Sequence, residues 1–204
     1  AYIHPSDYLD LINLYIDDTV EINGEIFSKG RYHLRSAKNN ESIYQFINTL
    51  DFPALKKTLS DLTERFPYTT VTHSANEETY KLITGPDLSP IIKSDLMAVG
   101  GHGYLHVNFS VLNEEQLAEQ LKTSDDIFRL YGCDPVKSLA FPYGYFNEQV
   151  LTICRQWGYK YLIAAGSVPA EYLNRVFPRI GILNLAGFAY NILSVNRGFN
   201  RFGF

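Results

Sequence analysis

The second half of the chain alternates short apolar runs with segments that have apolar residues at helical spacing. Three of the runs have the length and composition of strands: 96–99, 138–141 and 161–165. Strands that alternate with helices of this length usually pair in parallel through right-handed crossovers. This order therefore predicts a βαβαβ unit in an α/β protein, either as a doubly wound sheet or as a (β/α) barrel.

The two segments between these runs carry residues that start and stop helices. Asn113 followed by Gln116 forms a capping-box pair, and the buried stripe of this first helix is expected to continue to 127–130. Asn147 is the expected N-cap of the second helix, and Gly158 follows its end. We therefore expect both helices to begin and end near these residues.

The first half is less regular. It predicts a strand at 1–3, a helix that starts at Ser6 or Asp7, a hairpin at 20–27 around the pair Asn23 and Gly24, and helices at 40–50 and 51–65. Prolines at 67, 86 and 90 are expected to interrupt the approach to the next strand. With no repeat or linker in the sequence, we expect one domain over 1–204, divided into an irregular half at 1–95 and a βα half at 96–204.

Composition narrows the classes of function. The chain is 46% apolar and 20% charged with a net charge of −4, which indicates a folded protein without a basic stripe for nucleic acid. Its apolar runs are too short to span a bilayer. Cys133 and Cys154 fit neither a redox pair nor a zinc knuckle, so we expect two core thiols. The 15 tyrosines, 13 phenylalanines and one tryptophan suit contact with carbohydrate.

The residues at 100–106, with the sequence GGHGYLH, follow the first expected strand. His102 and His106 are four residues apart, a spacing that lets two imidazoles bind one metal ion. Glycines at this point let the backbone turn sharply at the carboxyl end of a strand, where barrel enzymes keep their sites. The alternative is a pair of ordinary loop histidines.

The residues at 139–144, with the sequence LAFPYG, follow the second expected strand in the same way. The backbone N–H of Tyr143 is expected at the tip of this strand, where it is suited to stabilise an oxyanion. The alternative is a β-turn with an aromatic plug.

Together, these two motifs and the helix that ends in Trp157, Gly158 and Tyr159 resemble the polysaccharide deacetylase family, the NodB-homology domain of carbohydrate esterase family four. The resemblance implies a distorted (β/α) barrel with an elaborated N-terminal half. It implies that His102 and His106 bind a divalent metal, most often zinc and sometimes cobalt or nickel. It also implies that the Tyr143 N–H belongs to the oxyanion hole and that Pro142 and Tyr143 line the substrate groove.

The sequence departs from the family pattern at several positions. Gly103 replaces a Ser or Thr, Ala140 stands where an Arg is usual, and no histidine follows His106 to act as the acid. The motif with two aspartates, which supplies the base and a third metal ligand, is absent, and we expect it to lie upstream of Ala1. The alternative is that these carboxylates are substituted or lost, since the pair Asp17 and Asp18 follows a helix rather than a strand.

The sequence therefore predicts a metal-dependent hydrolase that removes N-acetyl or O-acetyl groups from a polysaccharide of the cell envelope or exterior. A catalytically inactive carbohydrate-binding domain and an esterase or cyclic-amide hydrolase are the alternatives. His4, His33 and His73 are the remaining histidines, and we expect ordinary surface positions for them.

Overall fold

The computed structural model describes residues 5–72, 83–134, 136–166 and 168–179. The chain divides into two compact units, Ala1–Pro90 with Leu105–Val107 and Ile91–Tyr104 with Asn108–Phe204. The single-domain organisation stays a prediction. The strand expected at 1–3 lies outside the described residues, as do His4 and His73.

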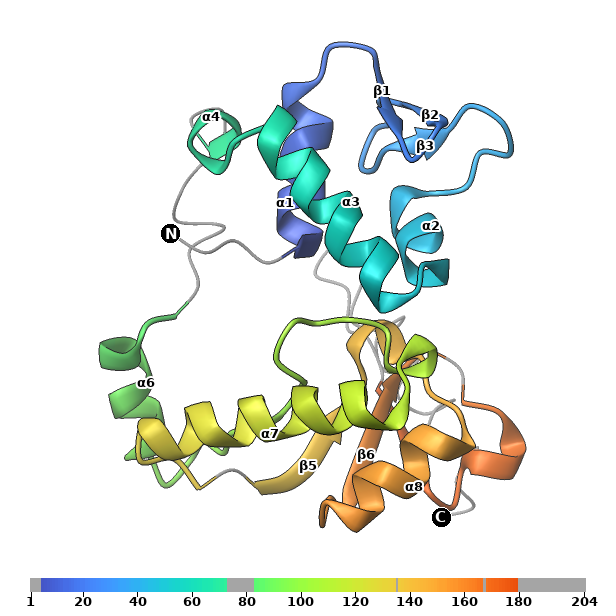
Figure 1. Ribbon diagram of the computed structural model, residues 1–204. Coiled ribbons are helices and arrows are strands. Elements are labelled where there is room, and N and C mark those ends of the chain that lie inside the picture. The colour runs from blue at the N-terminus through green and yellow to red at the C-terminus, as the bar shows by residue number, and fades with distance from the viewer. Residues whose placement is uncertain (1–4, 73–82, 135, 167, 180–204) are drawn as a thin grey trace, which may run out of the picture. The chain divides into compact units, whose positions relative to one another are not determined.

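Helices enclose the core of the first unit: α1 (Pro5–Tyr15), α2 (Ile43–Thr49), α3 (Phe52–Arg65) and α4 (Tyr68–Thr72) (Figure 1). Tyr8 of α1 is fully buried, and its hydroxyl donates to the carbonyl oxygen of Phe66 at 2.8 Å. Its ring lies 4.7 Å from that of Tyr68, centroid to centroid. These contacts satisfy the one polar atom of a large buried side chain and join α1 to the region that follows α3.

The predicted hairpin is confirmed. Strand β1 (Thr19–Ile22) pairs antiparallel with β2 (Glu25–Ser28), which in turn pairs with β3 (Arg35–Ser36). Asn23 and Gly24 occupy the turn with φ values of 51° and 78°. Positive φ at both central residues is what a two-residue turn of type I′ requires.

The helices expected at 40–50 and 51–65 also form, with boundaries set by their caps. Ser42 and Gln45 form a capping box at α2, which therefore begins later than expected. Asn40 lies in the left-handed region with φ 61° and cannot belong to the helix. At α3 the side chain of Asp51 accepts a hydrogen bond from the Ala54 N–H.

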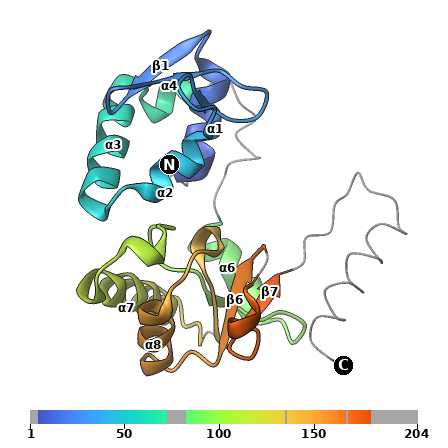
Figure 2. The same ribbon diagram turned by 90° about the vertical axis from the view of Figure 1, so that its right-hand side faces the viewer.

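The second unit is built on a parallel sheet, as the sequence predicts. Its strands lie in the order β4 (Gly100–Gly101), β5 (Val136–Ala140), β6 (Tyr161–Ala165) and β7 (Val176–Arg179). Helices α7 (Glu114–Leu130) and α8 (Glu148–Gln156) lie on the same side of this sheet (Figures 1 and 2). The α/β class is confirmed, but the described strands form an open row and close no barrel. No helix among the described residues is long and apolar enough to cross a membrane.

Both helix starts in this unit are confirmed. The side chain of Asn113 accepts from the Gln116 N–H at 2.9 Å, and the side chain of Gln116 accepts from the Asn113 N–H at 3.1 Å. Asn147 caps α8 by accepting from the Val150 N–H at 2.9 Å. Since each cap satisfies backbone donors that the first turn leaves open, these polar residues fix where the helices begin.

Two expectations are wrong, and one helix was not predicted. The apolar run at 96–99 is not a strand but a turn and irregular chain, in which Leu96 is 95% exposed. The stripe at 127–130 does not stay buried, because Leu130 at the end of α7 is 77% exposed. In addition, the short helix α6 (Gly85–Ile92), which contains Pro86 and Pro90, was not predicted. In the first two cases apolar residues lie where no neighbouring element covers them.

Candidate functional site

His102 follows β4 directly and is tied to the end of the neighbouring strand. Its Nδ1 lies 2.7 Å from the carbonyl oxygen of Ala140, the last residue of β5. A carbonyl oxygen only accepts hydrogen bonds, so Nδ1 must carry the proton. The lone pair of a neutral imidazole then lies on Nε2, which is the arrangement found in histidines that bind metal ions.

Close packing of two glycines brings His102 to this position. A Cβ atom on Gly100 would lie 2.4 Å from Ser138 Oγ. One on Gly101 would lie 3.0 Å from Leu139 Cδ1 and 3.1 Å from the hydroxyl oxygen of Tyr159. Strand β4 therefore lies closer to β5 than a side chain would permit, and the register shifts between the two glycines.

Tyr159, which packs against Gly101, is itself held in place by a hydrogen bond from its hydroxyl. It is 2% exposed, and its hydroxyl donates to Asp125 Oδ1 at 3.0 Å. Burial raises the pKa of Tyr159 above its usual value, and the neighbouring Asp125 carboxylate raises it further. The hydroxyl thus stays protonated and holds the buried carboxylate of α7 next to the start of the histidine motif.

Gly103 departs from the Ser or Thr of the family motif for a local reason. Its φ is +78°, and a Cβ atom there would lie 2.8 Å from Cζ of Phe109, a fully buried ring. Both the backbone conformation and the space favour glycine at this position. The departure therefore reflects how the loop packs on the ring of Phe109.

His106 lies in the segment Leu105–Val107, which belongs to the first unit, and it is half-buried. Its φ is 51°, in the left-handed region that non-glycine residues seldom occupy. Such backbone strain is concentrated at functional positions and tight turns. The two histidines of the motif are four residues apart in sequence, and the metal-binding role of the pair stays a prediction.

Tyr143 lies at the turn that follows β5, as expected. The φ and ψ of Tyr143 are 56° and −1°. Pro142 before it is buried, and Gly144 after it has a φ of 81°. The Gly144 N–H donates to the carbonyl of Phe141 at 3.0 Å. A Cβ atom on Gly144 would lie 2.6 Å from the carbonyl oxygen of Ala165 in β6. The turn is therefore pressed against the neighbouring strand, which holds Tyr143 in its strained conformation.

A cluster of aromatic rings supports this turn from inside the unit. Phe141 is 2% exposed and stacks on Phe146 with ring centroids 5.2 Å apart. Phe109 contacts Phe141 edge to face at 6.4 Å, and Phe146 contacts Tyr172 in the same way at 5.2 Å. The ring of Phe109 thus contacts the loop after β4 through Gly103 and the loop after β5 through Phe141.

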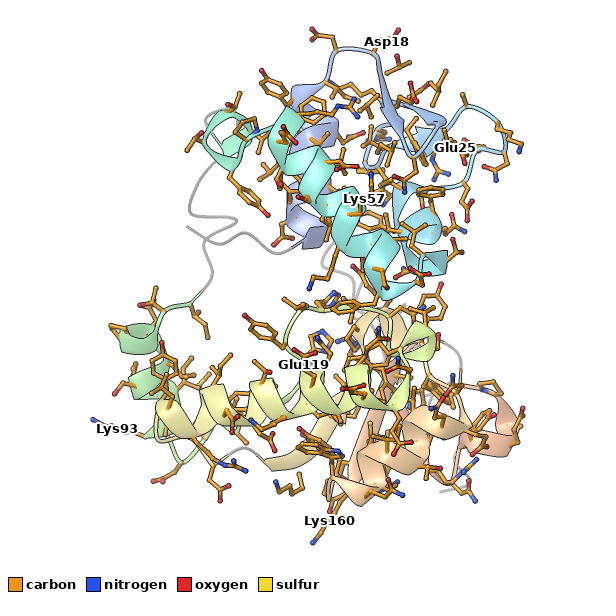
Figure 3. All side chains as sticks on the ribbon, viewed as in Figure 1. Asp18, Glu25, Lys57, Lys93, Glu119 and Lys160 are labelled. Carbon is orange, nitrogen blue, oxygen red and sulfur yellow. The ribbon has the colours of Figure 1, made fainter. Side chains whose placement is uncertain are left out.

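The donor chemistry at His102 fits a metal ion, but the described residues do not supply a full ligand set. Among residues 5–72, 83–134, 136–166 and 168–179 no group of three or more His, Cys, Asp and Glu side chains is suited to hold an ion. The pair Asp17 and Asp18 lies exposed in the connection between α1 and β1, and Asp18 is labelled there in Figure 3. His33 bonds Asp10 within the first unit. A third ligand and a catalytic base are therefore not identified among these residues.

Sequence reasoning missed the role of Ala140. Its methyl side chain stands where the family motif has an Arg, and only this substitution is visible in the sequence. The residue acts instead through its backbone carbonyl, which orients His102. No side-chain signal marks such a role, although the position of Ala140 at the end of a parallel strand next to His102 is a usable indication.

Comparisons with known proteins agree with the motifs. The sequence model of the polysaccharide deacetylase family matches residues 38–162, more than half of the 204 residues. A solved structure, Streptococcus pyogenes deacetylase PplD in complex with acetate, matches with a TM-score of 0.45 and 22% identity over 69% of this chain and 61% of that one. No curated protein matches the sequence significantly. On the strength of the family match, the chain belongs to the polysaccharide deacetylase family.

Proposed function

We propose that this protein is a metal-dependent hydrolase that removes N-acetyl or O-acetyl groups from a polysaccharide, with His102 and His106 as metal ligands. Family membership supports the reaction class. The observation that carries the metal assignment is the bond from His102 Nδ1 to the Ala140 carbonyl oxygen. That bond leaves Nε2 as the atom that binds, and zinc is the metal that best suits imidazole ligands at a hydrolytic site.

A bound metal ion supplies a water of lowered pKa and polarises the carbonyl of the acetyl group. The protein's own contribution is to orient the reacting groups. The Ala140 carbonyl keeps the proton of His102 on Nδ1, and the strained turn fixes the direction of the Tyr143 N–H. We assign that N–H to the oxyanion that develops when the acetyl carbonyl is attacked. Pro142 and the ring of Tyr143 line the substrate groove in this proposal.

The base that takes the proton of the water and the third metal ligand are assigned to none of the residues that the structure describes. Removing an N-acetyl group also needs an acid that protonates the departing amine. The exposed pair Asp17 and Asp18 lies in the connection between α1 and β1 of the first unit, and no role is assigned to it.

Acetate release tests the proposal directly. The full-length protein, loaded with zinc, is incubated with an N-acetylglucosamine oligomer, with an O-acetylated polysaccharide and with aryl acetates. We expect acetate from one of the first two substrates and its loss in His102→Ala. Glu119→Gln, at an exposed position on α7, serves as the control and is expected to match the wild type.

Each outcome separates the candidate functions. Preferred turnover of aryl acetates would favour the esterase alternative. Glycan binding without acetate release would favour the inactive carbohydrate-binding domain. Zinc binding that is unchanged in His102→Ala would contradict the metal assignment even if acetate were released.

A further inference from the structure

The loop at 29–34 of the first unit is held firmly against α1. The buried side chain of Asn13 both donates to the carbonyl of Gly30 and accepts from its N–H, each at 3.3 Å. Lys29 Nζ donates at 3.3 and 2.9 Å to two carbonyl groups near the C-terminal end of α1. These bonds fix the backbone of the loop independently of the side chains at its tip.

A polar cluster lies where this loop meets α1 and α2. Asp10 Oδ1 accepts from the Tyr44 hydroxyl at 2.5 Å and from His33 Nδ1 at 3.4 Å. The rings of His33 and Tyr44 are in edge contact with centroids 4.8 Å apart. The side chains of Asp10 and His33 are 36% and 40% exposed. Within the described part of the chain, no other group bonds the remaining atoms Asp10 Oδ2 and His33 Nε2.

Tyr32 stands at the tip of the same loop with its ring largely in solvent. The residue is 65% exposed, and its ring centroid lies 6.4 Å from that of His33. The guanidinium of Arg31 lies 5.0 Å from the centre of the Tyr32 ring. The Tyr32 ring therefore contributes little to the core and stands on a loop whose backbone is fixed by hydrogen bonds, beside the polar cluster of Asp10 and His33.

We propose that Tyr32, His33 and Asp10 form a sugar-binding subsite that takes one neutral pyranose residue of a polysaccharide. The Tyr32 ring offers an apolar face to the C–H groups of the sugar, as aromatic rings with a polar end do at binding surfaces. The free carboxylate oxygen accepts from one hydroxyl, and His33 Nε2 accepts from a neighbouring one. The choice of a polysaccharide as the ligand rests on the proposed function.

Other ligands fit these residues less well. A metal ion needs more donors than one carboxylate and one imidazole, and no cluster of three such groups occurs among the described residues. A phosphate would be attracted by Arg31 but repelled by the Asp10 carboxylate. A neutral polyol is neither attracted nor repelled by the opposite charges of Arg31 and Asp10, and it can contact the ring of Tyr32 that lies near them.

Nuclear magnetic resonance can test this subsite separately from the hydrolytic reaction. The His102→Ala protein is titrated with the β-1,4 tetramers of N-acetylglucosamine and of glucose, and amide shifts of 29–34 are followed. We expect saturable shifts in this loop with at least one tetramer, and at least about tenfold weaker binding there in Tyr32→Ala and Asp10→Asn. Tyr15→Ala removes another exposed tyrosine of the same unit and should bind as the parent does.

Two results would overturn the subsite: no saturable shift at 29–34 with either tetramer, or equal binding in the parent and Tyr32→Ala proteins. Thermal melting of each variant verifies that the fold is retained. The readout requires no turnover, so loop binding can persist when acetate release fails, and acetate release can persist when loop binding is absent. The two proposals can therefore fail independently.

Discussion

The imidazole of His102 donates from Nδ1 to the carbonyl oxygen of Ala140 at 2.7 Å, which joins the end of β4 to the end of β5. This bond selects one of two neutral tautomers before any metal binds. A long-range ¹H–¹⁵N spectrum of the metal-free protein should show a protonated Nδ1 and an unprotonated Nε2. A predominant Nε2–H tautomer would contradict the orientation on which the metal assignment rests.

The turn after β5 should tolerate no side chain at Gly144. In Gly144→Ala the Cβ would lie 2.6 and 2.9 Å from the carbonyl oxygen and the nitrogen of Ala165, both backbone atoms. We expect the left-handed conformation to cost about 1–2 kcal/mol and the overlap to add about 1–3 kcal/mol. Denaturant unfolding measures the loss.

Gly158→Ala is the matched control for this substitution. Gly158 has φ +85°, close to that of Gly144, but no heavy atom lies within 4 Å of the position of its Cβ. The free energy of unfolding of Gly158→Ala should therefore fall only by the cost of the left-handed backbone conformation, without a contribution from steric overlap. Equal losses in the two variants would show that the packing of Gly144 on Ala165 does not matter.

Restoring the usual family residue at Gly103 should harm this protein. Gly103→Ser places a Cβ at φ +78° and 2.8 Å from Phe109 Cζ, so we expect a lower melting temperature and no gain in zinc affinity. Gly24→Ser has the same φ but open space, and it should destabilise less. A Gly103→Ser protein as stable as Gly24→Ser would contradict the local explanation for this departure.

Local signals predicted much of the fold because each is satisfied within a few residues. The pair Asn113 and Gln116 caps α7 by reciprocal hydrogen bonds, and the turn at Asn23 and Gly24 needs only a backbone conformation. Strand β6 was located correctly because its apolar run, Tyr161–Ala165, begins shortly after Gly158, which follows the end of α8.

Features that depend on distant partners were not visible in the sequence. The apolar run at 96–99 looked like a strand, whereas β4 consists of Gly100 and Gly101, whose close approach to β5 depends on the absence of side chains. Strand β7 was not predicted, since Pro178 interrupts its pattern and a proline fits best in an edge strand. At the candidate site, the spacing of the histidines and the residues after the second expected strand point to His102 and Tyr143, whose roles stay predictions, but nothing in the sequence pointed to the backbone carbonyl of Ala140.

The buried pair of Asp125 and Tyr159 gives a stability prediction. Tyr159→Phe removes the hydroxyl that donates to a carboxylate only 7% exposed, so we expect a loss of about 1–3 kcal/mol in the free energy of unfolding. Replacing both partners, in Tyr159→Phe with Asp125→Leu, should recover part of it. Tyr161→Phe, at a position 55% exposed, is the control and should change little. A loss that the double substitution deepens would contradict this account.

The buried thiol of Cys154 makes the free energy of unfolding depend on pH in the alkaline range. Burial raises the pKa of its thiol from 9.0 to about 12 in the folded state, whereas the unfolded chain titrates near the ordinary value. Both states keep the proton below pH 9, so this contribution is fully present there. As pH rises from 9 toward about 12 the unfolded state loses its proton first, and stability falls by up to about 1.4 kcal/mol per pH unit.

Replacing the thiol isolates this contribution from the buried tyrosines, since Tyr8 and Tyr159 also have pKa values raised by burial. Denaturant unfolding of wild type and Cys154→Ala is compared at several pH values from 8 to 11. The small cavity in the variant lowers stability equally at every pH, so only the slope reports the thiol. We expect a shallower decline above pH 9 in Cys154→Ala, because one of the groups that titrate only on unfolding is gone. Parallel curves would mean that the thiol titrates in the folded protein as readily as in the unfolded chain.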